Sequence, residues 1–126
     1  MALVHHELCF GCGRVNLFGL LLELEPAGPD AVAGRGFLKQ DHQGADRGYA
    51  HEGVVAAALL DAMALACGPD ARITKFEISY REPAPVGAFL DIEARVEGRD
   101  GPRADATATA RVEERMVAQA RGSYRL

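Results

Sequence analysis

One carboxylate, Asp61, stands inside an otherwise apolar segment. Residues 54–67 carry no other charged side chain and are rich in alanine and leucine. Burial of an ionised carboxylate is unfavourable unless the group is paired, solvated or turned toward a cavity. Asp61 is therefore a candidate general base or nucleophile, with a pKa that dry surroundings can tune. The alternative is a structural carboxylate that meets water or pairs with an arginine.

A short stretch, Gly48-Tyr49-Ala50-His51-Glu52-Gly53, leads into this apolar segment. If a helix begins there, its free backbone N–H groups and the positive end of its dipole can polarise a carbonyl oxygen. Gly53 would also allow a bulky group to approach the backbone closely. Gly53 is thus a candidate oxyanion donor, although a glycine that merely ends a loop has the same appearance.

The N-terminal segment holds a second group of reactive side chains. His5, His6, Cys9 and Cys12 offer ligands at a spacing that a zinc ion can use. A single Cys-x-x-Cys pair is weak evidence for a metal, so we expect these cysteines to serve packing, with no metal bound. The chain has three cysteines, too few for a disulfide framework, and no apolar N-terminal run of signal-peptide length. These features predict a cytoplasmic protein.

The pattern of apolar residues predicts the helix that carries Asp61. The apolar run 54–67 predicts a helix that ends at Gly68, in a left-handed cap, before Pro69. At about 1.5 Å per residue this helix would span about 21 Å, which is too short to cross a bilayer. Because it is apolar on all sides, we expect protein to surround it.

Alternating apolar and polar residues predict strands on both sides of this helix. The predicted strands cover residues 20–25, 32–39, 76–81, 90–97, 104–113 and 116–124. Short links join the last four, so we expect them to be antiparallel neighbours in chain order. A sheet with one apolar face and a wholly apolar helix predict an α+β fold in which the sheet curls around the helix. The alanines of the row 104–110 would let the helix approach closely.

Length and composition narrow the class of protein. The 126 residues suit one domain, 1–126, and 48% hydrophobic residues are enough for a folded core. The net charge of −4 and the absence of a basic cluster argue against a dedicated nucleic-acid binder.

Three stretches carry a resemblance to a known family. They are Cys9-Phe-Gly-Cys12-Gly13 with Asn16 and Gly19-Leu20; His42-Gln43-Gly44; and His51-Glu52-Gly53 running on to Leu59-Leu60-Asp61-Ala62-Met63. In this order they resemble the Cys-x-x-Cys-Gly-x-x-Asn-x-x-Gly-Leu, His-Gln-Gly and His-Gly-Gly…Leu-Leu-Asp-Glu-Ala-Met motifs of hotdog-fold thioesterases, of the small bacterial acyl-CoA, phenylacetate-pathway-like type. The resemblance covers nearly the whole chain. It implies a curved antiparallel sheet of five to six strands wrapped around one long central helix.

The chain departs from the family pattern at two positions. Glu52 replaces the central glycine of His-Gly-Gly, and Leu60 stands where the first acid is expected, nine residues after His51. Asp61 lies one residue later, which is about 100° further around a helix. Counted from Gly53, however, the spacing of eight is one that the family also uses. Either the motif has slipped by one residue or the hydrolytic acid has been lost.

The resemblance implies an acyl-CoA thioesterase with no required cofactor beyond the coenzyme A of its substrate. Asp61 would be the base or nucleophile, and Gly53 would be the oxyanion donor. Glu52, which departs from the family pattern, is the carboxylate that could carry the chemistry if Asp61 is structural. Gln43 is a candidate to orient a water or the thioester oxygen, or else a structural residue of the loop, and His51 is expected to hold the loop through hydrogen bonds. The cationic side chains of Arg72, Lys75 and Arg81 are candidates to bind the phosphates of coenzyme A.

Distance along the helix adds a constraint on assembly. Asp61 and Gly53 would lie about 12 Å apart along one helix axis, so a single helix cannot bring both to one carbonyl. Two antiparallel helices across a two-fold axis can, which predicts a homodimer or a dimer of dimers with shared sites. The alternative function, suggested by Glu52 and Leu60, is a non-hydrolytic acyl-CoA-binding hotdog protein. A hotdog hydratase would pair an aspartate with a catalytic histidine in a different motif.

Overall fold

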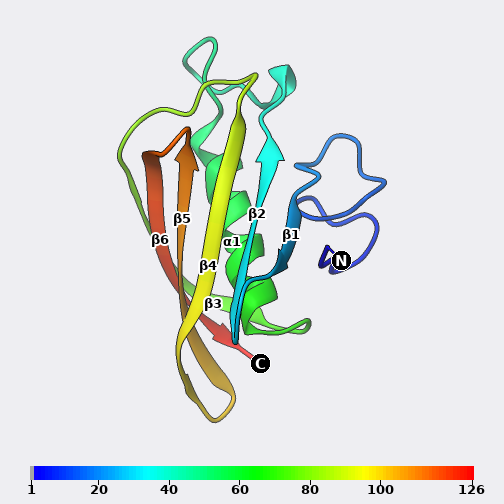
Figure 1. Ribbon diagram of the computed structural model, residues 1–126, viewed down its shortest axis with the longest axis vertical. Helices are drawn as coiled ribbons and strands as arrows, with labels where there is room; N and C mark the ends of the chain where they lie inside the picture. Colours follow the sequence, from blue (N-terminus) through cyan, green and yellow to red (C-terminus); the bar gives the residue numbers. More distant parts are fainter. Residues whose placement is uncertain (1) are drawn as a thin grey trace.

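The computed structural model describes residues 2–126 and shows one curved sheet packed against one helix (Figure 1). The strands are β1 Glu23–Pro26, β2 Ala31–Phe37, β3 Arg72–Tyr80, β4 Phe89–Asp100, β5 Arg103–Val112 and β6 Arg115–Arg125. The sheet order is β1-β2-β4-β5-β6-β3, and every pair is antiparallel. Helix α1, Glu52–Cys67, lies between β2 and β3 in the chain, and a 3-10 turn covers Gln40–His42.

Helix α1 begins two residues earlier than its apolar run. His51 is the N-cap residue, and its side chain accepts a hydrogen bond from the Gly53 N–H. The helix ends at Cys67, and the Gly68 N–H donates to the carbonyl of Ala64. Gly68 has φ 148° and ψ 163°, so the predicted left-handed helical cap is wrong. The backbone instead takes a conformation that is essentially restricted to glycine.

The helix packs mainly against the inner faces of β4 and β5. The predicted inward row of β5, Ala104, Ala106, Ala108 and Ala110, is buried. These side chains are small, which allows the close approach of helix and sheet that the sequence predicted. The predicted inward leucines at positions 20, 22 and 24 are also buried and belong to the same core.

The pairing of β3 corrects the predicted strand order. β3 pairs with β6 at one edge of the sheet, and β4 lies between β2 and β5. The expectation that β3 and β4 are neighbours is therefore wrong. Residues 81–88 carry the chain from one side of the sheet to the other, and β2 occupies the edge of β4 that β3 was expected to take. Alternation marks a strand but does not specify its partner.

The edge position leaves β3 less covered than the other strands. Phe76 and Ile78 pack against the core, but Ile73 and Tyr80 are more than two-fifths exposed. Within residues 2–126, β3 has a strand neighbour on one side only. An open edge presents unpaired N–H and C=O groups to another chain.

Across the same described part of the chain, no helix has both the length and the apolar character needed to cross a membrane.

Candidate functional site

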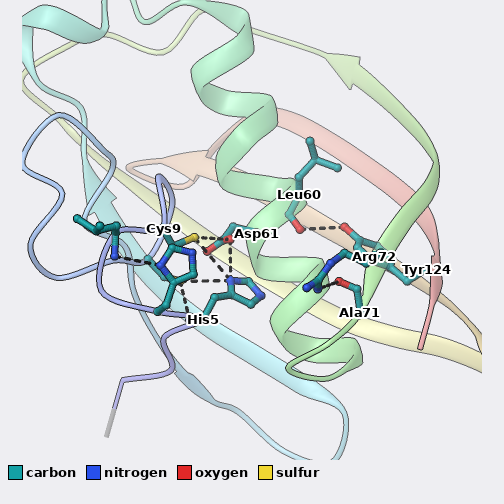
Figure 2. A network of polar contacts seen from close by, with 10 residues as sticks. His5, Cys9, Leu60, Asp61, Ala71, Arg72 and Tyr124 are labelled. Atoms are coloured by element: carbon teal, nitrogen blue, oxygen red, sulfur yellow. Dashed lines mark hydrogen bonds and ion pairs between the residues drawn. The ribbon is translucent and has the colours of Figure 1, made fainter.

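The N-terminal segment runs beside β1 and meets helix α1 at Asp61 (Figures 1 and 2). His5 Nδ1 lies 3.0 Å from Asp61 Oδ1, and the Cys9 thiol donates to the same oxygen at 3.4 Å. The side chains of His5 and Asp61 are only 15% and 12% exposed. The second oxygen, Asp61 Oδ2, is buried and has no hydrogen-bond partner among residues 2–126. The carboxylate is thus enclosed by the protein's own groups.

Cys12 completes this arrangement, which we call the N-terminal cluster: His5, Cys9, Cys12 and Asp61. Cys12 is fully buried, and its sulfur lies 3.4 Å from His5 Nδ1 and accepts the His5 N–H at 3.2 Å. Cys9 Sγ lies 3.7 Å from the same ring nitrogen. One ligand atom from each of the four residues falls within 4.8 Å of all the others. His6, grouped with them from the sequence, instead accepts the Leu8 N–H and stands outside the cluster.

Charge in the N-terminal cluster is dominated by the pair of His5 and Asp61. The hydrogen bond to Asp61, with a further contribution from Cys12, raises the pKa of His5 to about 11. Burial raises the pKa of the Cys12 thiol. With no metal bound, His5 is therefore an imidazolium at neutral pH and neutralises the carboxylate. The sequence suggested an arginine as the structural partner of Asp61, and the structure supplies a histidine from the N-terminal segment.

Close backbone packing holds the N-terminal cluster together. A Cβ atom on Gly11 would lie 2.6 Å from Asp61 Cγ, and one on Gly13 would lie 2.6 Å from the Cys9 carbonyl oxygen. The Gly13 N–H donates to that carbonyl at 2.9 Å, and Leu22 donates to the Gly11 carbonyl at 2.8 Å. The glycines of the Cys-x-x-Cys-Gly stretch are thus positions where the loop turns tightly and presses on the helix.

A second location lies at the start of helix α1. Glu52 is exposed and lines a pocket of about 290 Å³, together with Tyr80 and Arg81. The Tyr80 hydroxyl donates to the Glu52 carbonyl at 2.7 Å, and burial together with the charge of Glu52 raises the pKa of Tyr80. The Gly53 N–H donates to His51 Nδ1 at 2.7 Å. In this chain the predicted oxyanion donor therefore already has an acceptor.

The remaining polar candidates form hydrogen bonds within the loop before the helix. The Gln43 amide donates to the Gln40 carbonyl at 2.8 Å and accepts the Gly48 N–H at 2.6 Å. His42 is 4% exposed, and its Nδ1 accepts the Lys39 N–H at 3.0 Å. The His42 carbonyl accepts the His51 N–H at 2.8 Å, which places the start of the helix. These contacts fit the loop-holding role that the sequence gave to His51.

The three cations proposed for coenzyme A do not meet within one chain. Arg72 donates to the Ala71 carbonyl and lines a pocket of about 500 Å³ beside Asp61 (Figure 2). Lys75 lies with Glu77 in a groove on the outer face of the sheet. Arg81 donates to Gln119 Oε1 at 2.8 Å, near the start of the helix. Only Arg81 shares a pocket with Glu52.

The capping contact of His51 leads to a first testable prediction. Replacing His51 with alanine removes the acceptor of the Gly53 N–H and is expected to destabilise the protein by about 1 kcal/mol. Urea unfolding monitored by circular dichroism measures this difference. His6→Ala is a suitable control, because His6 is exposed and caps no helix. A His51→Ala variant as stable as the wild type would contradict the capping role.

Comparison with known proteins finds solved structures that are similar to this chain. No family model and no curated protein sequence matches the chain. A variant of the phenylacetic acid degradation protein PaaI from Thermus thermophilus is similar over 83% of this chain and 93% of its own, with 25% identity and a TM-score of 0.76. The PaaI protein of the E. coli phenylacetic acid degradation operon shows 16% identity, a TM-score of 0.77 and coverage of 84% and 79%.

A third solved structure comes from an animal. Zebra fish thioesterase superfamily member 2 is similar over 83% of this chain and 80% of its own, with 23% identity and a TM-score of 0.75. The six-stranded antiparallel sheet and the single helix agree with the architecture that the sequence motifs implied. The structural neighbours of this chain are hotdog-fold proteins of the thioesterase superfamily, and the chain has their fold.

Proposed function

We propose that this protein hydrolyses acyl-CoA thioesters at a pocket beside a subunit interface. The observation that carries the proposal is the meeting of a free carboxylate and a helix N-terminus at one pocket. Glu52 and Gly53 are the first residues of helix α1, and Glu52 lines the pocket of about 290 Å³ with Arg81. The thioesterase-superfamily fold of the structural neighbours supports a thioester as the substrate class.

Two carboxylates compete for the role of general base. Asp61 is the residue that the sequence favoured, but its Oδ1 is engaged by His5 and Cys9 and its Oδ2 is shielded from solvent. Asp61 also lines the pocket of about 500 Å³, but a water or thioester there would compete with His5 and Cys9 for Oδ1, and Oδ2 is closed to solvent. Glu52 is exposed at the pocket, so we assign the role to Glu52 and retain Asp61, supplied by a partner subunit, as the competing assignment.

The proposed reaction uses a water as the nucleophile. The Glu52 carboxylate takes a proton from the water while the oxygen of that water attacks the thioester carbonyl carbon. The negative charge that develops on the carbonyl oxygen is stabilised by the helix N-terminus, where that oxygen replaces His51 as the acceptor of the Gly53 N–H. Collapse of the tetrahedral intermediate breaks the carbon–sulfur bond, and the proton held by Glu52 passes to the leaving sulfur. Coenzyme A is then released as its thiol with a free acid as the second product, and Glu52 is again a carboxylate.

Recognition of coenzyme A in this proposal begins with Arg81. Its guanidinium lies in the same pocket as Glu52, where it can meet a phosphate of the cofactor portion of the substrate. Arg72 and Lys75 lie elsewhere on the chain, so they contribute to this pocket only if a partner subunit brings them there.

The second subunit is proposed from the uncovered parts of the fold. The open edge of β3 carries the exposed Ile73 and Tyr80, and Tyr80 also reaches the start of the helix. Ala56, Ala57 and Leu60 on the helix are only partly covered. A two-fold axis beside β3 would pair the two edges, set the helices side by side and cover these surfaces.

We therefore expect the protein to be at least a dimer at micromolar concentration. Sedimentation equilibrium measures the mass directly. An Ile73→Lys substitution places a charge on the exposed edge and is expected to weaken the association. Glu93→Lys is the matched control, because Glu93 is exposed on β4, which has strand neighbours on both sides and lies away from the β3 edge. A wild-type protein that sediments as a monomer would remove both the dimer and the shared site.

Release of coenzyme A thiol from a panel of acyl-CoAs of different chain length and with aromatic acyl groups tests the activity itself. We expect turnover with at least one class of acyl group, which would identify the substrate. Tight binding without turnover across the whole panel would instead favour the non-hydrolytic acyl-CoA-binding function. Binding of each acyl-CoA to the protein is measured by calorimetry on the same preparations.

A further inference from the structure

We propose that His5, Cys9, Cys12 and Asp61 bind one zinc ion, which fastens the N-terminal segment to helix α1. The proposal does not depend on Glu52 being the general base, but it excludes the competing assignment of that role to Asp61. The two sulfurs, the ring nitrogen and the carboxylate are all groups that zinc accepts as ligands. Three of them come from the N-terminal segment and the fourth from the helix (Figure 2).

The distances between the donor atoms fit a tetrahedral ion. Zinc bonds sulfur at about 2.3 Å and nitrogen or oxygen at about 2.0–2.2 Å, which places its ligands roughly 3.3–3.8 Å apart. In the structure, His5 Nδ1 lies 3.0 Å from Asp61 Oδ1, 3.4 Å from Cys12 Sγ and 3.7 Å from Cys9 Sγ. Cys9 Sγ lies 3.4 Å from Asp61 Oδ1. The other two pairs of donor atoms lie within 4.8 Å, so an ion at the centre requires the side chains to adjust their positions around it.

A buried polar atom without a hydrogen-bond partner in the N-terminal cluster also supports a bound ion. Asp61 Oδ2 is sealed from solvent without a partner among the described residues 2–126, although burying an unpaired carboxylate oxygen is costly. The His5 N–H already donates to Cys12 Sγ at 3.2 Å, the kind of backbone contact that stabilises a metal-bound thiolate. Gly11 leaves room for the loop to press against Asp61.

The donor set favours zinc over the alternatives. Magnesium and calcium prefer oxygen ligands, whereas two thiolates and an imidazole suit zinc. Four protein ligands fill a tetrahedron, as in structural zinc sites, so the ion would hold the fold together and leave no position for a substrate water. Binding converts both thiols to thiolates and frees the ring nitrogen, with release of their protons to solvent.

The site also explains the position of Asp61 relative to the family pattern. A carboxylate one residue beyond the expected catalytic position faces the N-terminal segment, where His5 and Cys9 surround it. In this proposal the acid of the apolar helix serves as a metal ligand. The sequence alone favoured cysteines that serve packing, and that reading is the competing outcome of the test.

The test begins with tag-free protein produced in zinc-supplemented medium and purified without chelators. Elemental analysis is expected to find about one zinc per chain, and Cys9→Ser and Cys12→Ser are expected to reduce this to a small fraction. Cys67→Ser is the matched control, because Cys67 is buried at the far end of the helix and is outside the N-terminal cluster. It should retain the full zinc content.

Two further measurements use the wild-type chain and do not depend on a variant folding. Cobalt added to metal-free protein should give the visible and charge-transfer bands of tetrahedral thiolate-bound Co²⁺. Cys9 and Cys12 should resist a thiol reagent until a chelator is added. Zinc far below one per chain together with no cobalt bands would overturn the proposal in favour of packing. Full zinc content in both Cys9→Ser and Cys12→Ser would overturn it as well.

Discussion

Replacing Glu52 with glutamine is expected to lower kcat by roughly 100-fold or more, with little loss of stability. Glutamine keeps the size of the side chain and its hydrogen bonds but cannot accept a proton from water. Glu52 is exposed, so its replacement leaves no buried group unpaired. Steady-state release of coenzyme A thiol, measured on the best substrate of the panel, gives kcat and KM for each variant.

A matched control separates the chemistry from the loss of a negative charge. Glu77 is an exposed carboxylate on the outer face of the sheet, where it pairs with Arg121. Glu77→Gln is expected to leave kcat unchanged. If Glu52→Gln retained wild-type kcat, the general base would not be Glu52, and the competing assignment to Asp61 would be tested next.

Replacing Asp61 with asparagine is expected to cost about 3 kcal/mol of stability, a fall in Tm of roughly 10 °C, with turnover per folded molecule nearly unchanged. Without the carboxylate, a bound metal loses one ligand, and in the metal-free protein the His5 imidazolium is left buried without its partner. Thermal unfolding and thioesterase assays on one preparation measure both quantities. Asp100→Asn, at an exposed turn between β4 and β5, is the control.

A double-mutant cycle with His5→Gln tests whether Asp61 acts through the N-terminal cluster. If it does, the stability losses of the two single variants will not add, because either substitution alone already breaks the same contacts. The opposite pattern would return the catalytic role to Asp61: a stable Asp61→Asn variant in which kcat falls by roughly 100-fold or more.

Local patterns in the sequence predicted the helix and six strands of this fold, although β1 begins at Glu23, three residues after the predicted start, and β3 begins at Arg72, four residues before it. Residue alternation marked the strands, and the alanine row of β5 anticipated the close contact with the helix, because burial on one face produces a period of two. Pairing was not predictable in the same way. The position of β3 at the sheet edge, next to β6, depends on which strand takes each side of β4, a choice that alternation does not encode.

For the candidate site, too, the sequence identified the residues and the tertiary structure decided which of them lie together. The sequence by itself identified Asp61 as the one charge in the apolar run 54–67, and it identified the Cys9–Cys12 pair and the Glu52-Gly53 helix start. Only the tertiary structure brought His5 and both cysteines onto Asp61 while leaving Glu52 open at a different pocket. The physical reason is that side-chain type is local, whereas a contact between residues as far apart in the chain as His5 and Asp61 exists only after the N-terminal segment has packed on the helix.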